Sequence, residues 1–444
     1  MPCRIRRSAL AGPVVALIAI VPTELLAVSF TVNSGGDAPD AAIDGVCETA
    51  PGNQVCTLRA AVDETNASGD PNRRVALPAL TVTLTQGFVL ISQPLTIEGA
   101  GRGASVLQAP PGARQAGLKV LADVVLRDLT MRGFGGASFG AIDARANLTV
   151  ERSDFVDNDV TQSGGGGGAI SQSLLPPARS LTLADCEFRE NVAAYGGAIF
   201  LAYASARVER STFADNLATL GAGGALFASP VATNLTMLDS TLVGNRSNED
   251  GGAIFVDSTG GVGPEVRIYN SSFLGNDSDA DLNGSGAGGA FLNRAPPPNV
   301  QLANSILADN GESAFLFHFY IRVAQECRGG ATSNGHNIVL FDDGSCAIAG
   351  AVTAADPLFE PLAFHGGPTE TLAIAAGSPA IDAGNPAAAG GCYDDLGAPI
   401  ATDQRGAVRP YGAECDLGAF EWGALIFGDD YELGSTGRWT TIGP

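Results

Sequence analysis

The carboxylates whose spacing is most suggestive of chemistry lie in the segment Asp277-Ser-Asp279-Ala-Asp281-Leu-Asn283-Gly284. From Asp279 it reads D-x-D-x-N-G, the first half of a calcium-binding loop, in which oxygen ligands alternate along the chain. The second half is incomplete, because Ala290 stands where a glutamate would supply the last ligand. The segment therefore predicts either a solvated acidic loop or a calcium site formed by Asp277, Asp279, Asp281 and Asn283.

A second kind of chemistry, glycoside hydrolysis, needs two carboxyl groups a few ångström apart on a groove. The acidic residues that recur in or beside one repeated turn are candidates for such a pair: Asp157, Glu190, Asp215 and Glu249. Polar residues are expected in a turn whether or not they react. These positions therefore favour a structural role.

The three histidines are isolated, so they form no Ser/His/Asp arrangement and no metal-ligand spacing. His336 and His365 stand in glycine-rich, turn-like contexts, and His318 lies in the aromatic run Phe315-Leu-Phe-His-Phe-Tyr320. That run predicts a buried strand, with a sugar-stacking groove as the alternative. The sequence assigns no catalytic residue and no cofactor beyond the candidate Ca²⁺.

Six cysteines fall in pairs that are close in sequence: Cys47 with Cys56, Cys327 with Cys346, and Cys392 with Cys415. None has the spacing of a zinc site, so the pairs predict three disulfides formed in an oxidising compartment. Cys186 is left over in the stretch Leu181-Thr-Leu-Ala-Asp-Cys, where a small buried residue is expected. It is interpreted as a buried free thiol.

The first 27 residues have the pattern of an export signal. Arg4, Arg6 and Arg7 precede an apolar run from Leu10 to Val21, and Ala27 offers a small residue at a cleavage point. The alternative is an uncleaved anchor helix, for which the apolar run is short. Export agrees with the cysteine pairs, and no later stretch predicts a membrane helix.

Two interleaved motifs recur every 25 to 37 residues through the middle of the chain. The first is an apolar residue, two variable residues and asparagine, with the asparagines at Asn158, Asn191, Asn216, Asn245, Asn276 and Asn310. The second is Gly-Gly-Ala followed by an apolar residue, with its second glycine at Gly168, Gly197, Gly224, Gly252 and Gly289. Two motifs that share one variable period indicate a repeat architecture.

The flanking segments alternate apolar and polar residues, as in Leu148-Thr-Val-Glu and Val266-Arg-Ile-Tyr, and none carries a helical stripe. This pattern predicts an all-β fold, a single-stranded right-handed parallel β-helix or solenoid with capping modules, at roughly 25 to 30 residues per coil. The glycines would form tight corners, and the asparagines would stack in a hydrogen-bonded ladder.

These repeats resemble those of chlamydial polymorphic outer-membrane proteins and of bacterial β-helix proteins with the pectin-lyase fold. The resemblance covers about residues 80 to 350 and implies the fold. It implies no single function, because the fold carries lyases, hydrolases, adhesins and spacers alike. Lyases of the fold place a basic residue beside calcium, and nothing in the sequence fixes Arg267 or Arg294 opposite the acidic segment.

The N-terminal stretch Cys56-Thr-Leu-Arg-Ala-Ala is similar to the name motif of the CSLREA domain, which begins exported bacterial β-helix proteins. Leu58 to Asn66 can form two helical turns that cover the open first coil. Asp37, Asp40 and Asp44 precede this segment, where exposed loop carboxylates are expected and Ca²⁺ ligands are the alternative.

The C-terminal stretch from Asp356 to Glu421 resembles the choice-of-anchor Q domain, a module of surface or secreted bacterial proteins. Its charged residues are expected to pair with one another and cap the last coil: Asp403, Arg405, Arg409, Asp416 and Glu421. The final residues resemble a short tail of exported gammaproteobacterial proteins, with Asp430-Tyr431 in place of its Gly-Phe.

The expected organisation is a signal at 1–27, a CSLREA-like cap at 28–75, β-helix repeats at 76–350, a choice-of-anchor Q-like module at 351–422 and a tail at 423–444. A net charge of −22 argues against binding nucleic acid or an anionic membrane surface. We expect an exported, non-catalytic protein, secreted or at the outer membrane of a Gram-negative bacterium, that mediates adhesion or binds a polysaccharide, a host or cell-surface glycan, or another partner. The alternatives are a polysaccharide lyase or glycoside hydrolase of the same fold, acting on acidic or neutral polysaccharide, and a passive spacer.

Overall fold

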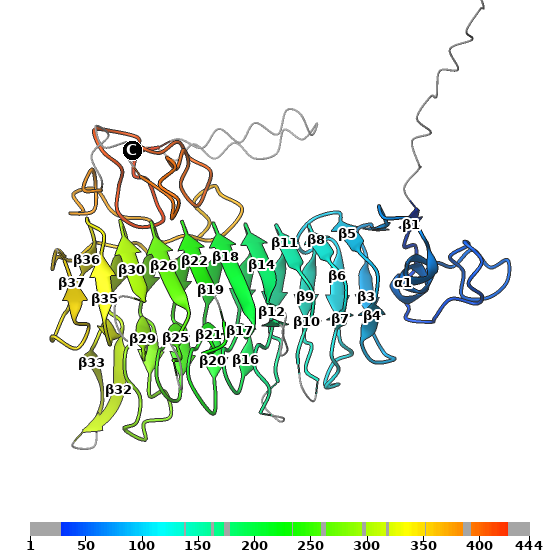
Figure 1. Ribbon diagram of the computed structural model, residues 1–444, viewed down its shortest axis with the longest axis horizontal. Helices are drawn as coiled ribbons and strands as arrows, with labels where there is room; N and C mark the ends of the chain where they lie inside the picture. Colours follow the sequence, from blue (N-terminus) through cyan, green and yellow to red (C-terminus); the bar gives the residue numbers. More distant parts are fainter. Residues whose placement is uncertain are drawn as a thin grey trace, which may run out of the picture.

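The computed structural model describes residues 28–424 apart from 137–138, 161–163, 173–177, 233, 259–262, 295–298, 317–318, 351 and 385–391. The predicted signal, His318 and almost all of the tail lie outside the described residues. The chain forms a right-handed parallel β-helix, with a cap at its N-terminal end and a C-terminal module against its side (Figure 1). Within the described part, no helix is long and apolar enough to cross a membrane.

Four sheets run along the solenoid, and successive coils add one strand to each. Sheet A has twelve strands, in the order β1 (Ser29–Thr31), β2 (Arg74–Leu77), β5 (Leu95–Gly99), β8 (Val124–Arg127), β11 (Leu148–Glu151), β14 (Arg179–Ala184), β18 (Ala204–Glu209), β22 (Asn234–Leu238), β26 (Glu265–Tyr269), β30 (Val300–Ala303), β35 (Ala331–Ser333) and β37 (Ile348–Ala349). Sheet B has ten strands, in the order β3 (Thr81–Thr83), β6 (Val106–Gln108), β9 (Thr130–Arg132), β12 (Asp154–Val156), β15 (Glu187–Arg189), β19 (Thr212–Ala214), β23 (Thr241–Val243), β27 (Ser272–Leu274), β31 (Ile306–Ala308) and β36 (Ile338–Val339).

Sheet C has nine strands, which are β4 (Val89–Ile91), β7 (Leu118–Val120), β10 (Ile142–Ala144), β13 (Ile170–Gln172), β17 (Ile199–Leu201), β21 (Leu226–Ala228), β25 (Ile254–Val256), β29 (Phe291–Asn293) and β34 (Cys327–Arg328). Sheet D is shorter and consists of β16 (Val192–Ala193), β20 (Leu217–Ala218), β24 (Arg246–Ser247), β28 (Asp277–Ser278), β32 (Gly311–Leu316) and β33 (Phe319–Ala324). The strands of all four sheets pair in parallel except β32 and β33, which form an antiparallel hairpin. The predicted fold class is therefore confirmed.

The core consists of the inward-facing side chains of each coil, stacked on their equivalents in the next. Phe155, Phe188 and Phe213 are fully buried, with ring centroids 5.0 and 4.7 Å apart along the stack. Ala198 and Ile199, which follow one Gly-Gly corner, are also fully buried. Because like residues repeat at one place in each coil, the core is continuous along the axis.

The predicted asparagine ladder is present at the corner between sheets B and D. The Nδ2 atoms of Asn158, Asn191, Asn216, Asn245 and Asn276 each donate to the Oδ1 of the next asparagine, over 2.7 to 2.9 Å. All six asparagines are buried. The ladder ends where Asn310 donates to Oε2 of Glu326, which is fully buried. Glutamate thus takes the place of an amide at the last rung.

A second ladder, of serines, lies at the corner between sheets A and B. The backbone N–H of Ser211 donates to Oγ of Ser240, and that of Ser240 to Oγ of Ser271. Cys186 occupies the equivalent place one coil earlier, where its N–H donates to Oγ of Ser211. Cys186 is buried and carries no disulfide, as the sequence indicated.

The Gly-Gly corners need glycine for two different reasons. At Gly196 φ is +58°, in the left-handed region that glycine adopts most readily. At Gly224 a Cβ would lie 2.1 Å from the carbonyl oxygen of Gly252 in the next coil. The equivalent positions Gly197, Gly252 and Gly289 are equally tight, with nearest backbone atoms at 2.0 to 2.4 Å. The second glycine therefore sets how closely the coils stack.

The N-terminal end is covered by α1 (Leu58–Ala67), close to the predicted bounds (Figure 1). Thr57 caps the helix by accepting a hydrogen bond from the N–H of Ala60, and the disulfide Cys47–Cys56 closes the preceding loop. The other two predicted disulfides, Cys327–Cys346 and Cys392–Cys415, are also formed.

The C-terminal module lies along the outer face of sheet B, whereas the sequence placed it over the last coil. Its Gln404 exchanges hydrogen bonds with Thr212 and Thr241, and the N–H of Ala419 donates to Oγ of Ser272. Side chains on the outer face of sheet B pack against it as well, among them Ile306. The polar and apolar residues on the outside of these coils explain why the module packs on the side of the solenoid.

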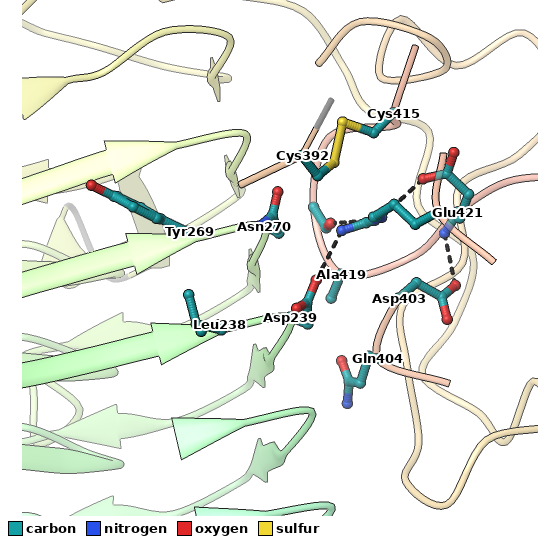
Figure 2. Close-up of polar contacts among 12 residues, drawn as sticks. Leu238, Asp239, Tyr269, Asn270, Cys392, Asp403, Gln404, Cys415, Ala419 and Glu421 are labelled. Atoms are coloured by element: carbon teal, nitrogen blue, oxygen red, sulfur yellow. Dashed lines mark hydrogen bonds and ion pairs between the residues drawn. A yellow bond between two sulfur atoms is a disulfide. The ribbon is translucent and has the colours of Figure 1, made fainter. Parts of the chain in front are cut away.

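A buried ion network holds this module in place (Figure 2). Arg409 is fully buried, and it donates to Asp239 on the solenoid and to Glu421 in the module, both over 2.9 Å. Asp403 pairs with Arg405 and accepts from the N–H of Glu421. Asp416 accepts from the N–H groups of Asp382 and Trp422, and burial raises its pKa to about 7. The predicted residues thus form one network, and one of its contacts reaches the solenoid.

Candidate functional site

The outward-facing side chains of sheet C form one row along the solenoid. Strand pairing places Lys119 of β7 beside Asp143 of β10, and Asp143 beside Ser171 of β13. The row continues from Leu90 of β4 at one end to Phe200 of β17 at the other. Strands lie about 4.8 Å apart, so the row presents one side chain at each such step.

A groove of about 510 Å³ lies over the first part of this row. The charged and aromatic residues that line it are Phe88, Arg114, Lys119, Phe139, Asp143 and Arg145, and the polar residues Gln115 and Ser171 line it as well. The strands that carry Lys119 and Asp143 lie in the N-terminal half of the solenoid, at β7 and β10 (Figure 1). The two arginines come from the segments that enter β7 and leave β10.

Three cationic side chains gather in this groove, although the chain carries a net charge of −22. Lys119 is the only lysine in the sequence. Its Nζ lies 5.3 Å from the ring centroid of Phe88, within range of a cation–π contact. Arg114 and Arg145 have side chains that are 48 and 43 % exposed, and they pair with Asp159 over 3.9 Å and with Asp143 over 2.9 Å.

Asp143 is the buried acidic group of the groove. Its side chain is 3 % exposed, and Oδ2 accepts from Nε of Arg145 over 2.9 Å. The other oxygen, Oδ1, is buried and has no hydrogen-bond partner. A buried acceptor without a donor costs about 1–3 kcal/mol, so such groups are rare in folded proteins.

The N-terminal cap positions one aromatic wall of the groove. Arg59, from the Cys56-Thr-Leu-Arg-Ala-Ala motif, donates to the carbonyl oxygens of Gly87 and Phe88. The same guanidinium pairs with Asp37 over 2.8 Å, and Asp37 accepts the N–H groups of the turn at 85–86. Asp37 is therefore buried and paired, and the sequence was wrong to expect an exposed carboxylate there. The cap fixes the backbone that presents the Phe88 ring.

Beyond Ser171 the outward row becomes aromatic. Phe200 stacks on Phe227 with centroids 5.3 Å apart, and Phe227 lies 5.1 Å from Phe255. Phe227 and Phe255 are buried, while Tyr195, which meets Phe227 edge to face, is 39 % exposed. Phe227 and Phe255 therefore belong to a small hydrophobic cluster outside the main core. The accessible aromatic surface of this cluster is the ring of Tyr195.

The candidate calcium residues lie on a different part of the solenoid, around β28. Oδ1 and Oδ2 of Asp279 accept from the N–H groups of Asn283 and Gly284, and Oδ2 of Asp277 accepts from Oγ of Ser313. Asp281 accepts from the side-chain amide of Asn283. The described residues contain no group of three or more His, Cys, Asp or Glu side chains suited to a metal ion. Oδ1 of Asp277 is buried without a hydrogen-bond partner, and calcium binding at these residues stays a prediction.

Arg267 and Arg294 do not face that loop. Arg267 pairs with Glu265 and approaches Asp395 of the C-terminal module. Arg294 pairs with Asp250 and lies over the ring of Phe255.

The turn carboxylates proposed for glycoside hydrolysis lie at an exposed corner. Asp157, Glu190 and Asp215 stack there with φ of 54 to 55°, in the left-handed region. Glu249 lies after β24, where its carboxylate accepts from Oγ of Ser285. Asp157, Glu190 and Asp215 thus form the turn at this corner, and the structural role that the sequence favoured stays a prediction for all four residues.

A pair of carboxylates does occur in register elsewhere, on the outer face of sheet B. Asp154 of β12 lies beside Glu187 of β15, and burial raises the pKa of both. Glu187 accepts the N–H of Glu370 from the C-terminal module over 2.7 Å. This pair is thus covered by the module and contributes to its docking.

The described histidines have structural contacts. Nδ1 of His336 lies 3.0 Å from the carbonyl oxygen of Ala383, and His365 packs edge to face on Phe420. Burial, together with the nearby Arg405, lowers the pKa of His365. The aromatic run 315–320 falls on the hairpin of β32 and β33, with residues 317–318 outside the described part.

Sequence reasoning missed the groove. Lys119, Asp143 and Arg145 belong to no motif, and coil lengths vary, so their register is fixed only by the strand pairing. One signal was available, namely that the only lysine of an acidic chain stands in the β-helix repeats.

No family model matches the chain, and a search of the curated proteins found no match. Among solved structures, the chain is similar to the crystal structure of pectate lyase Pel9A, with a TM-score of 0.44 and 15 % identity, over 90 % of this chain and 97 % of that one. At this level of similarity the comparison says nothing about activity.

Proposed function

We propose that this chain is an exported β-helix protein that binds a linear acidic polysaccharide in the groove on the outer face of sheet C and holds it without cleaving it. The observation that carries the proposal is the gathering of Arg114, Lys119 and Arg145 around one groove of a strongly acidic chain. The three disulfides agree with an oxidising, extracellular setting.

The groove suits a chain of uronate sugars for three reasons. Lysine and arginine donate charge-assisted hydrogen bonds to carboxylates, and such bonds are about twice as strong as neutral ones. The Phe88 ring is 40 % exposed and offers a flat apolar surface for a sugar face. The outward row repeats at the strand spacing, so the groove can contact successive sugars of an extended chain.

A polysaccharide lyase is the second candidate, and one observation favours it. Lys119 and Arg145 flank Asp143 in the same groove, so a cation and a group able to accept a proton would both lie beside a bound uronate. Retention at the outer membrane of a Gram-negative bacterium, and adhesion to a host or cell-surface glycan, are further parts of the proposal.

The test measures binding and turnover together. The purified chain is screened against uronate-containing and neutral polysaccharides, with and without Ca²⁺, and the release of unsaturated or reducing ends is followed. We expect binding to uronate polymers that weakens with added salt, with no product. Release of unsaturated ends would instead establish the lyase, and binding to neutral polymers alone would contradict the proposal.

Replacing the groove lysine tests the assignment of the site. Lys119→Ala is expected to weaken uronate binding about tenfold, because one charge-assisted hydrogen bond is lost. The control is Arg132→Ala, which removes an exposed cation from the outer face of sheet B, where its guanidinium contacts Gln108. Equal effects of the two variants on binding would place the site elsewhere.

A further inference from the structure

Asp143 shares an unpartnered buried oxygen with Asp154, Asp277 and Glu326, but it is the one of these carboxylates that lines the groove. At one corner of the solenoid, by contrast, both oxygens of Asp128 accept from Arg152, each over 2.8 Å. Asp143 lies under the groove with one oxygen bound to Arg145 and the other without a donor. Nothing in the fold requires an acidic residue here, since the equivalent positions in the adjoining coils are Lys119 and Ser171.

Two long cationic side chains line the groove together with Asp143. Arg145 is 43 % exposed, and Lys119 of the adjoining strand is half-buried. A carboxylate that enters the groove would draw both cations toward itself by charge attraction. A sugar held by these cations would bring its ring hydroxyls close to Asp143, whose Oδ1 is an acceptor without a donor.

We propose that Asp143 is a specificity-determining residue, whose Oδ1 accepts a hydrogen bond from a ring hydroxyl of the sugar while Arg145 and Lys119 hold the carboxylate of the bound chain. The inference rests on the proposed function and adds a selection rule to it. A groove that uses this acceptor binds uronate chains with free ring hydroxyls and discriminates against chains whose hydroxyls are acetylated. An acetylated sugar has no hydroxyl to donate and leaves the buried Oδ1 of Asp143 without a hydrogen bond. A site of this kind discriminates strongly against a ligand that lacks the donor.

The experiment compares two forms of one polymer on two forms of the protein. Affinity is measured for unesterified polygalacturonate and for the same polymer O-acetylated on its ring hydroxyls. The wild-type chain is expected to prefer the free polymer by about tenfold or more, the value of one hydrogen bond to a charged group. Asp143→Asn keeps the size and an oxygen for Arg145, but it replaces the free acceptor with an amide donor. This variant is expected to lose the preference and bind both polymers at similar, weakened affinity.

The matched control is Asp128→Asn, which makes the same charge change at a corner of sheets A and B and is expected to keep the wild-type preference. A structural loss at Asp143 would weaken binding of both polymers by the same factor and leave the ratio unchanged. That unchanged ratio overturns the inference while the proposed function stands. If the wild-type chain binds neither polymer, the proposed function fails for this polymer class and the inference fails with it.

Discussion

At the scale of single residues, two side chains differ in type from the serines and asparagines of the hydrogen-bonded ladders that they join, namely Cys186 and Glu326. Cys186 fills a serine position, and burial raises the pKa of its thiol to about 12, so it stays protonated and unreactive. Glu326 lies in register with Ala290 of the preceding coil, because Phe291 pairs with Cys327, and its side chain reaches the end of the asparagine ladder. A carboxylate there cannot donate as an amide does. Its Oε1 is buried without a partner, and burial raises the pKa of the carboxyl to about 7 from an ordinary value of 4.5.

Glu326 therefore predicts a pH-dependent stability. The carboxyl group of Glu326 binds its proton more tightly in the folded chain than in the unfolded chain. Its contribution to the free energy of unfolding is therefore fully present below about pH 4.5 and is lost as the pH rises through about 7. The free energy of unfolding is expected to fall by about 3 kcal/mol across that window from this group alone. The negative charge of Asp309 raises the pKa of Glu326 further, and the positive charge of Arg322 lowers it.

Glu326→Gln places an amide at the last rung and should remove this part of the pH dependence. Denaturant unfolding of the variant and the wild type at pH 5 and pH 8 measures the difference. The variant is expected to gain stability relative to the wild type as the pH rises. Parallel pH profiles for the two proteins would show that Glu326 is ionised in the folded chain at both pH values.

At the scale of elements, the asparagine ladder couples each coil to the next. Asn216 accepts from Asn191 and donates to Asn245 and to the carbonyl oxygen of Phe188. Asn216→Ala removes these bonds and leaves buried partners unsatisfied, at a cost of about 2–4 kcal/mol in unfolding free energy. The control is Asn248→Ala in the following coil, where the half-buried amide makes one bond to Thr219. A loss at Asn216 no larger than at Asn248 would show that the ladder adds little.

The elements also show which features could be predicted from the sequence. The corners of the coils could be predicted, because each corner requires a particular residue type. Gly224 must be glycine for close stacking of the coils, and Asn216 must supply a buried amide. The groove could not be predicted, because Lys119 and Asp143 become neighbours only through the pairing of strands in coils of unequal length. The position of the C-terminal module was also missed, since Thr212 and Thr241 read as ordinary strand residues until Gln404 packs on them.

At the scale of the whole molecule, three parts combine to present one surface. The solenoid supplies the row on sheet C, the N-terminal cap fixes Phe88 through Arg59, and the C-terminal module covers sheet B on a different face. The module therefore leaves the groove open. Its docking depends on Arg409, which joins Asp239 of the solenoid to Glu421 of the module.

Arg409→Met is expected to loosen the module, because it leaves two buried carboxylates without their cation. Removing one partner of a buried ion pair costs about 3–5 kcal/mol. Limited proteolysis should then cut the module at a lower protease concentration, while the solenoid stays intact. The comparison is Arg152→Met, which removes an exposed pair with Asp128 and should cost no more than about 1 kcal/mol. Equal protease resistance in the two variants would contradict the assigned role of Arg409.

Equilibrium binding of polygalacturonate to the wild-type chain and to Lys119→Ala, at low and high salt, tests whether the groove on sheet C binds acidic polysaccharide. The expected result is wild-type binding that weakens as salt is added, about tenfold weaker binding by the variant at low salt, and a smaller salt dependence in the variant. Wild-type binding that is insensitive to both salt and the Lys119 substitution would contradict binding in this groove.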